Sequence, residues 1–210
     1  MDAVNINVDT VNIMSLESNY HHGSLRAALI KAAFKLLDKD GINAVTIRQM
    51  ARVVGVAHSA PANHFKNKRE LFTALALEIF KQLSETLKVE LEPNDKNLRE
   101  SIHAFSKTIL DFGLKHPNRY KLLSRRDCFN SSDEELYKSM EEVYQHMTRI
   151  LSTHSNEDNL DAESQAIALW SMIHGYVMLR LEGALISGSD ELTGEDRQIA
   201  IVDVIINGLI

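Results

Sequence analysis

The sequence predicts an all-α protein of about nine helices, with a three-helix N-terminal segment followed by a larger helical domain. Apolar residues recur every three or four positions along most of the 210 residues, which is the period of a buried helix face. Glycine and proline are scarce, with nine and three residues respectively, and this disfavours a β protein rich in loops. The hydrophobic fraction of 44% is typical of a well-packed domain.

Three helices are expected near the N-terminus, after a polar and acidic arm over residues 1–18 that we expect to be flexible. The first helix follows a possible N-cap at Ser24. A Thr-x-x-Gln capping box at Thr46 opens the second helix. Gly55 then turns the chain into a third, short helix over about residues 58–65.

The remaining helices form the expected C-terminal domain. Apolar residues follow a 4,3,4,3 spacing in two of its segments, and its last two segments are apolar on more than one face. Its expected helices are one before Pro93, one on each side of Pro117, one over about 132–150, one over 161–185 and one over 194–210. The expected domains are the arm at 1–18, a helix-turn-helix domain at 19–66 with its motif at about 46–65, and the C-terminal domain at 67–210.

Charge is distributed unevenly along the chain. Residues 19–69 contain nine Lys or Arg and two Asp, which is a net charge of +7. Since the whole chain carries −6, the remaining residues carry −13. A basic N-terminal segment joined to an acidic body is typical of a protein whose head binds nucleic acid and whose body binds another partner.

Three features favour a cytoplasmic protein without a membrane segment. No secretory signal pattern opens the chain. The single Cys128 excludes an internal disulfide and fits a reducing compartment. The apolar segment 166–186 is long enough to cross a membrane, but His174, Arg180 and Glu182 would be costly in hydrocarbon, so a buried helix is the better interpretation.

Two short helices joined by a Gly turn and preceded by a third helix can place one helix in the major groove of DNA. Residues 20–75 also closely resemble the DNA-binding domain of the tetracycline-repressor (TetR) family, through "YHHG", "DGINAVTIRQMA", the "GV" turn and "HFKNKREL". A second resemblance lies in "ALWSMIHGYVML", where Trp170, His174 and Gly175 are similar to the Trp-His-Gly signature of one C-terminal subgroup of this family.

The resemblance implies an all-helical, ligand-responsive bacterial transcription regulator that acts as a homodimer. It implies that the first three helices bind double-stranded operator DNA, and that the C-terminal helices hold a pocket for an unknown small-molecule effector and the dimer interface. A repressor that binds a palindromic operator and is released by its effector is the expected form. No cofactor and no enzymatic activity are expected, because the sequence has no Gly-rich phosphate loop and no nucleophile elbow.

The expected DNA contacts surround the third helix. Pro61 fits only near the start of a helix, which makes that helix short. His58, Ser59 and Asn63 are candidates for base edges, with Ala60 or Pro61 against a thymine methyl. The candidates for phosphate contacts are Lys66, Lys68, Thr46, Arg48, His22 and His64.

The C-terminal domain offers candidates for a pocket and for a dimer interface. Apolar walls with a few polar groups suit a small molecule, although residues at helical spacing are more often plain core. The pocket candidates are Phe105, Phe112, Phe129, Met140, Tyr144, Met147, Trp170, His174 and Met178. The dimer candidates, expected to be exposed in a monomer, are Ile199, Val202, Ile205, Ile206 and Leu209.

Three alternatives stay open. The family usually has an aromatic residue where this chain has Ala62, so the protein could be a small-molecule or protein receptor with a vestigial DNA-binding head. Cys128 follows Arg125 and Arg126, which could lower the thiol pKa in a redox sensor. A helical enzyme that uses His174 or Cys128 is the third alternative. No metal site is expected, because the histidines are scattered.

Overall fold

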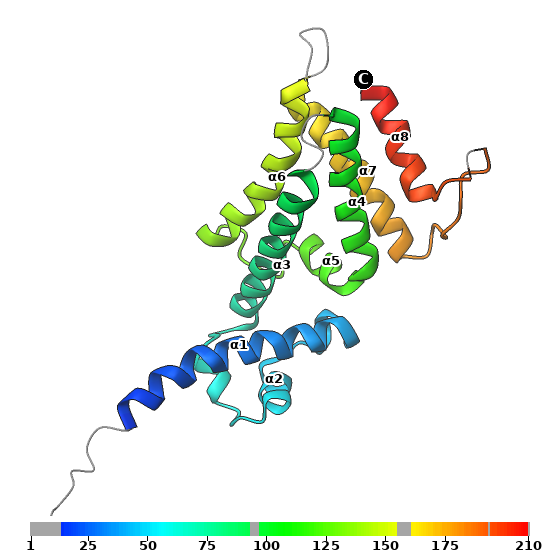
Figure 1. The fold of residues 1–210 in the computed structure, drawn as a ribbon. Helices are drawn as coiled ribbons and strands as arrows, with labels where there is room; N and C mark the ends of the chain where they lie inside the picture. The colour runs from blue at the N-terminus through cyan, green and yellow to red at the C-terminus, as the bar shows by residue number, and fades with distance from the viewer. Residues whose placement is uncertain (1–13, 93–96, 155–160, 193, 210) are drawn as a thin grey trace, which may run out of the picture. The chain divides into compact units, whose positions relative to one another are not determined.

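A computed structural model describes residues 14–92, 97–154, 161–192 and 194–209, with side chains described for 25–92, 97–153, 161–192 and 194–208. These residues form eight α-helices and two short 3-10 helices, and the prediction of an all-α fold is confirmed (Figure 1). None of the described helices is long and apolar enough to cross a membrane. The chain divides into two compact units, one up to Lys68 and one from Arg69 onward.

The N-terminal unit contains one long helix and three short ones. Its first helix begins earlier than predicted, at Met14, so the expected N-cap at Ser24 is wrong. No proline precedes Ser24, and Gly23 inside a helix costs only about 1 kcal/mol relative to Ala. Residues 1–13 of the predicted arm lie outside the described residues. The elements are α1 (Met14–Asp40), η1 (Ile42–Ala44), α2 (Ile47–Val54) and η2 (Ala60–Asn63).

One face of α1 forms the core of this unit. Leu29, Ala33 and Leu37 recur at four-residue spacing and are fully buried, as expected for the inner face of a helix. Helix α1 contacts α2 and η1, and α2 contacts η2. The ring of Phe65 is buried below the guanidinium of Arg26, which lies 5.4 Å from the ring centroid. Helix α2 and η1 are therefore held against α1 by a small apolar core.

The C-terminal unit is built around one central helix. Helix α4 contacts α5, α6, α7 and α8 (Figure 1). The elements are α3 (Lys68–Leu91), α4 (Leu98–Lys115), α5 (Pro117–Ser124), α6 (Glu134–His154), α7 (Ala162–Leu181) and α8 (Arg197–Leu209).

Helices α4 and α7 approach closely at Gly113. A Cβ atom at this buried position would lie 2.6 Å from Cγ1 of Val177 and 3.1 Å from Cδ2 of Tyr120. Since real Cβ contacts are longer than this, only glycine fits without a shift of its neighbours. The contact also places the ring of Tyr120, which lines the cavity described below.

Helices α3 and α6 are joined by polar contacts. The buried Ser84 hydroxyl of α3 donates to Oε2 of Glu142 at 3.0 Å. The ammonium of Lys88 lies 3.8 Å from the same carboxylate. At the start of α3, the hydroxyl oxygen of Thr73 accepts from the backbone N–H of Asn130 at 2.9 Å. The exposed ion pair adds little stability, whereas the partly buried hydrogen bond links the two helices at Ser84.

Helix α8 is anchored on α4 by apolar and charged contacts. Its Val202 and Ile206 are only 2% and 0% exposed. The Asp203 carboxylate accepts hydrogen bonds from Arg99 and from Nε2 of His103, the latter at 2.9 Å.

This packing changes the predicted dimer surface. The expectation that Val202 and Ile206 are exposed in a monomer is wrong, because α4 of the same chain covers them. Ile199 and Ile205 are half-buried, and the side chain of Leu209 lies outside the described residues. Among the described large apolar side chains of α8, Val204 is exposed, by 71%.

Candidate functional site

Helix α2 has defined signals at both ends. At its start, Oγ1 of Thr46 accepts a hydrogen bond from the backbone N–H of Gln49 at 3.2 Å, so the predicted N-cap is confirmed. At its end, Gly55 adopts the left-handed conformation with φ of 79°. The N–H groups of Gly55 and Val56 both donate to the carbonyl of Ala51, at 2.9 and 3.0 Å. Glycine is suited to this turn because it lacks the Cβ that disfavours positive φ.

The segment after the turn differs from the prediction. A short α-helix was expected over residues 58–65, and the structure has the 3-10 helix η2 at Ala60–Asn63. Ser59 occupies its N-cap position, but its side chain makes no capping hydrogen bond. Pro61 lies in the first turn, as predicted. Because proline has no N–H, it supports a single tight turn closed by the N–H of His64 on the Pro61 carbonyl at 3.0 Å.

The predicted DNA contacts lie on this turn and on the flanks of the motif. Pro61 is buried, so its predicted contact with a thymine methyl is wrong, because the ring packs into the unit. The side chain of His22 lies outside the described residues. The exposed candidates are Arg48, His58, Ser59, Asn63, Lys66 and Lys68, and the half-buried ones are Thr46, Ala60 and His64.

Replacing Thr46 by alanine is expected to loosen the start of α2. The substitution removes the acceptor for the Gln49 N–H, and loss of an N-cap costs about 1 kcal/mol. Hydrogen exchange at the Gln49 amide is therefore expected to become about fivefold faster, while Thr46→Ser, which keeps a capping oxygen, stays close to the parent. Equal exchange in the two variants would contradict the capping role.

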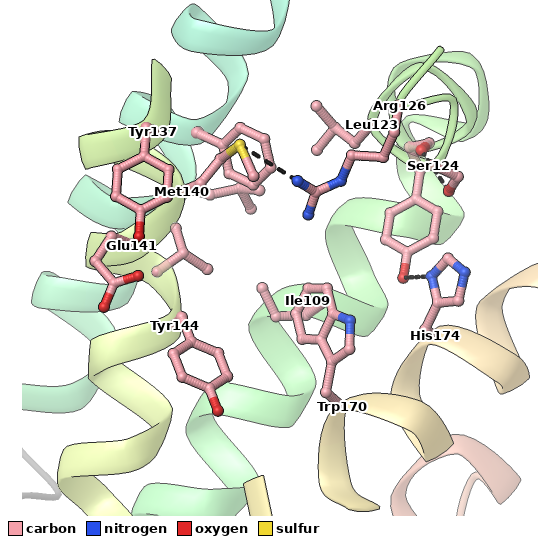
Figure 2. Close-up of a pocket in the computed structure, with 14 residues that line it drawn as sticks. Ile109, Leu123, Ser124, Arg126, Tyr137, Met140, Glu141, Tyr144, Trp170 and His174 are labelled. Carbon is pink, nitrogen blue, oxygen red and sulfur yellow. Dashed lines mark hydrogen bonds between the residues drawn. The ribbon is translucent and has the colours of Figure 1, made fainter. Parts of the chain in front are cut away.

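The C-terminal unit contains a cavity of about 440 Å³, within the size range of small-molecule sites. It lies between α6 on one side and α5 and α7 on the other, with α3 and α4 completing the walls (Figure 2). Its lining residues are Phe80, Leu83, Ile109, Tyr120, Leu123, Ser124, Arg126, Tyr137, Met140, Glu141, Val143, Tyr144, Trp170 and His174.

Only some of the predicted pocket residues line this cavity. Met140 and Tyr144 of α6 and Trp170 and His174 of α7 do so. The other five predicted residues do not line this cavity, because their side chains lie in the core or at other surfaces. Phe105, Phe129 and Met147 are 1%, 0% and 1% exposed core residues, Phe112 lines a separate cavity between α3 and α4, and Met178 is half-buried outside the lining.

Several lining residues were not predicted from the sequence. Tyr137 and Glu141 lie with the predicted Tyr144 on one side of α6, and this spacing of four and three residues was a usable signal. Phe80 belongs to α3, and Arg126 belongs to the loop after α5. No local pattern marks these two residues, since the fold brings them to the cavity from separate parts of the chain.

A neutral polar pair lies in the cavity wall. The hydroxyl of Tyr120 is 3.0 Å from Nδ1 of His174, and the two rings stack with centroids 5.6 Å apart. Burial lowers the pKa of His174 and raises the pKa of Tyr120, so both groups are neutral near pH 7. The tyrosine hydroxyl then donates to Nδ1, which leaves the imidazole proton on Nε2.

Acidification is expected to destabilise the C-terminal unit through His174. Its folded pKa lies below the ordinary value of 6.5, so the unfolded chain binds more protons between the two values. The contribution of His174 to stability is therefore complete above pH 6.5 and declines as the pH falls through the window below it.

Thermal unfolding at about pH 7.5 and about pH 5.5 tests this dependence. The loss of stability at the lower pH is expected to be smaller in His174→Gln than in the parent protein. A residual loss is expected from His146, because burial lowers its pKa too. Identical pH dependence in the parent and the variant would contradict the role of His174.

Cys128 lies beside an ion pair. The neighbouring Arg125 is paired with Asp127, with Nε–Oδ1 and Nη2–Oδ2 distances of 2.9 and 2.8 Å. The Cys128 thiol donates a weak hydrogen bond to the Asp127 carboxylate, with Sγ and Oδ2 3.9 Å apart. Within the described part of the chain, no group of three or more His, Cys, Asp or Glu residues could hold a metal ion.

Two family models match the chain in the order of its two units. The model described as "Bacterial regulatory proteins, tetR family" matches residues 29–75. The model described as "Tetracyclin repressor-like, C-terminal domain" matches residues 102–201. The Trp-His-Gly subgroup stays a prediction.

Several curated proteins are similar in sequence. The tetracycline repressor protein class D of Escherichia coli is 30% identical over 124 residues, which are 59% of this chain and 53% of that protein. The chain thus spans about half the length of that relative. The uncharacterized HTH-type transcriptional regulator YhgD of Bacillus subtilis is 28% identical over 160 residues, which are 75% of this chain and 80% of that protein.

Solved structures have the same fold. A protein of unknown function from Rhodococcus sp. RHA1 has a TM-score of 0.75 and 27% identity, and the match covers 90% of this chain and 97% of that one. The transcriptional regulator FadR of Bacillus subtilis, solved in complex with stearoyl-CoA, has a TM-score of 0.61 and 17% identity. That match covers 87% of this chain and 96% of FadR.

Proposed function

The chain belongs to the tetracycline-repressor (TetR) family of bacterial regulatory proteins, and from this premise we propose that it is a ligand-responsive transcriptional repressor. It binds a palindromic operator as a homodimer and is released by a small-molecule effector. The domain at 19–66 binds the DNA, and the domain at 67–210 binds the effector and the second copy. We also propose that it acts in the cytoplasm and has no enzymatic activity.

The DNA-binding proposal rests on the surface around η2. The turn exposes His58, Ser59 and Asn63, whose side chains can exchange hydrogen bonds with base edges. Lys66 and Lys68 follow on the exposed flank and can contact phosphates. Arg48 is exposed on α2. These exposed polar and basic side chains, presented by a capped helix, a tight turn and the segment after it, carry the proposal.

The effector proposal rests on the cavity of the C-terminal unit. Its volume suits a small molecule, and aromatic and aliphatic side chains dominate its walls. FadR, which shares the fold, was solved with stearoyl-CoA bound, and this supports ligand binding as the signal. Since a ligand shifts an equilibrium only by its preference for one state, the effector is proposed to prefer the state that does not bind DNA.

The homodimer proposal rests on apolar side chains that the single chain leaves exposed. Ile167, Trp170 and Leu179 of α7 are exposed, and so is Val204 of α8. Exposed apolar groups of this kind favour burial against a partner. A twofold dimer also suits a palindromic operator, because each copy then binds one half-site.

Selection of bound sequences from a pool of random duplexes tests the proposed function. Incubation at near-physiological salt is expected to enrich a palindrome with two equal half-sites. The exposed Ala62, where the family usually has an aromatic residue, favours a second candidate, a receptor with a vestigial DNA-binding head. A folded, dimeric protein that enriches no sequence would support this second candidate.

Lys68 and Asn63 are expected to affect DNA binding in different ways. Lys68→Ala removes one phosphate contact, so it should weaken binding to every duplex and lower the salt slope by about 1. Asn63→Ala should change the preference at one half-site position, by about 1–3 kcal/mol. Titrations at several salt concentrations measure both effects.

Lys107→Ala is the control, because Lys107 is exposed in the C-terminal unit and pairs with Asp111. A parental salt slope in Lys68→Ala would falsify the phosphate assignment.

A further inference from the structure

We propose that the effector is a small amphipathic acid, in which an apolar body fills the cavity and one carboxylate or similar anionic group pairs with Arg126. This inference rests on the proposed function, because it identifies the ligand class of the proposed effector site. It is carried by the composition of the cavity walls and by the charged groups that face the cavity.

The walls of the cavity suit an apolar body. Rings from four helices surround it, and aliphatic side chains and the Met140 thioether lie between them. The Tyr120 hydroxyl and Nδ1 of His174 are paired across 3.0 Å, so these two atoms do not need a polar ligand group. The rings are those of Phe80, Tyr120, Tyr137, Tyr144, Trp170 and His174.

Arg126 is the cationic side chain among the lining residues, and its guanidinium extends over the cavity toward α6 (Figure 2). Its Nη1 lies 3.8 Å from Sδ of Met140, and a thioether is only a weak acceptor. Within the described residues, its guanidinium has no carboxylate partner at ion-pair distance. A guanidinium has five N–H donors and matches a carboxylate with two parallel hydrogen bonds.

The neighbouring Arg125, unlike Arg126, is paired with a carboxylate. Arg125 makes a two-pronged ion pair with Asp127 and does not line the cavity. Both arginines are exposed on the same loop after α5. This loop therefore contains one arginine that is neutralised internally, Arg125, and one that is available to a ligand, Arg126. This pair supplies a matched control for the test.

Glu141 is the acidic side chain among the lining residues. Its carboxylate lines the α6 wall and accepts a hydrogen bond from Nε2 of Gln145 at 3.3 Å. Burial, together with the charges of Glu163, Glu141 and Asp161, raises the pKa of Tyr144 on the same wall. Glu141 repels an anion whereas Arg126 attracts one, so the position of the acidic group is set by Arg126. The acidic group is expected at the Arg126 end, with the apolar body directed between Trp170 and Tyr144.

The test uses matched ligands that differ only in charge. Three acids of graded size, phenylacetate, 4-phenylbutyrate and decanoate, are each compared with the corresponding neutral amide and cationic amine. Binding to the full-length protein without DNA is measured by calorimetry. Each acid that binds is expected to bind about tenfold more tightly than its amide, because a charge-assisted pair contributes more than about 1.4 kcal/mol. The amines are expected to bind more weakly than the amides.

Variants of the two arginines identify the group responsible. Arg126→Gln is expected to remove the preference for the acid over the amide, Arg126→Lys to keep part of it, and Arg125→Gln to keep all of it. Amide binding reports whether the cavity is intact in each variant. The proposal is overturned if acid and amide bind equally, if an amine binds most tightly, if no triplet binds, or if Arg125→Gln has the effect expected of Arg126→Gln. Operator binding by the ligand-free protein is measured separately, so failure of the proposed function is distinguishable.

Discussion

Replacing Phe105 by alanine is expected to destabilise the C-terminal unit by about 3–5 kcal/mol, the usual cost of removing a fully buried phenylalanine. Phe105 is 1% exposed and lies on α4, the helix that α5, α6, α7 and α8 contact. Phe105 does not line the 440 Å³ cavity. Its removal therefore leaves a separate void inside the core, and the cost includes that of the void. Unfolding in urea, followed by circular dichroism, measures the loss.

Trp170→Ala is the matched control for the distinction between core and cavity. Trp170 is 36% exposed and lines the cavity, so its removal creates no closed void. We expect a loss below about 2 kcal/mol, together with a clear loss of ligand binding. The Phe105→Ala variant, measured at a low temperature at which it stays folded, should keep the preference for the acid over the amide. If Trp170→Ala loses as much stability as Phe105→Ala, the assignment of the two residues is wrong.

Gly113→Ala is expected to be less stable than Gly175→Ala by about 1–3 kcal/mol, the usual cost of overpacking a core. Both glycines lie inside helices, so each substitution gains about 0.5–1 kcal/mol of helix propensity, and this gain cancels in the comparison. The new methyl group at Gly113 would lie 2.6 Å from Cγ1 of Val177, whereas a Cβ at Gly175 meets no atom within 4 Å.

The same comparison tests how α4 and α7 support the cavity. Relief of the clash at Gly113 requires a shift of Val177 or of Tyr120, and Tyr120 lines the cavity and contacts His174. Gly113→Ala is therefore also expected to weaken ligand binding, whereas Gly175→Ala leaves it unchanged. Melting temperatures and ligand titrations on both variants give the two readouts. Equal stability of the two variants would show that the helices separate without cost.

Local features of the fold were predictable from the sequence. The helical period, the Thr46 cap and the Gly55 turn are local signals, because they depend on hydrogen bonds and backbone angles within a few residues. The all-α class follows from the same period. The proline at position 61 indicated a short turn after Gly55, although that turn is a 3-10 helix and the proline ring is buried.

The sequence alone therefore predicts most of the helices and the separation of a basic head from an acidic body, although not the start of α1 at Met14. Which apolar residues face a void and which fill the core is visible only in the three-dimensional structure. Phe105 and Met147 have the same helical spacing as Met140 and Tyr144, yet the first two are core and the last two line the cavity. Likewise, α4 covers the Val202 face of α8 within one chain. The physical reason is that periodicity shows that a helix face is buried, whereas the partner that buries it is set by contacts between distant segments.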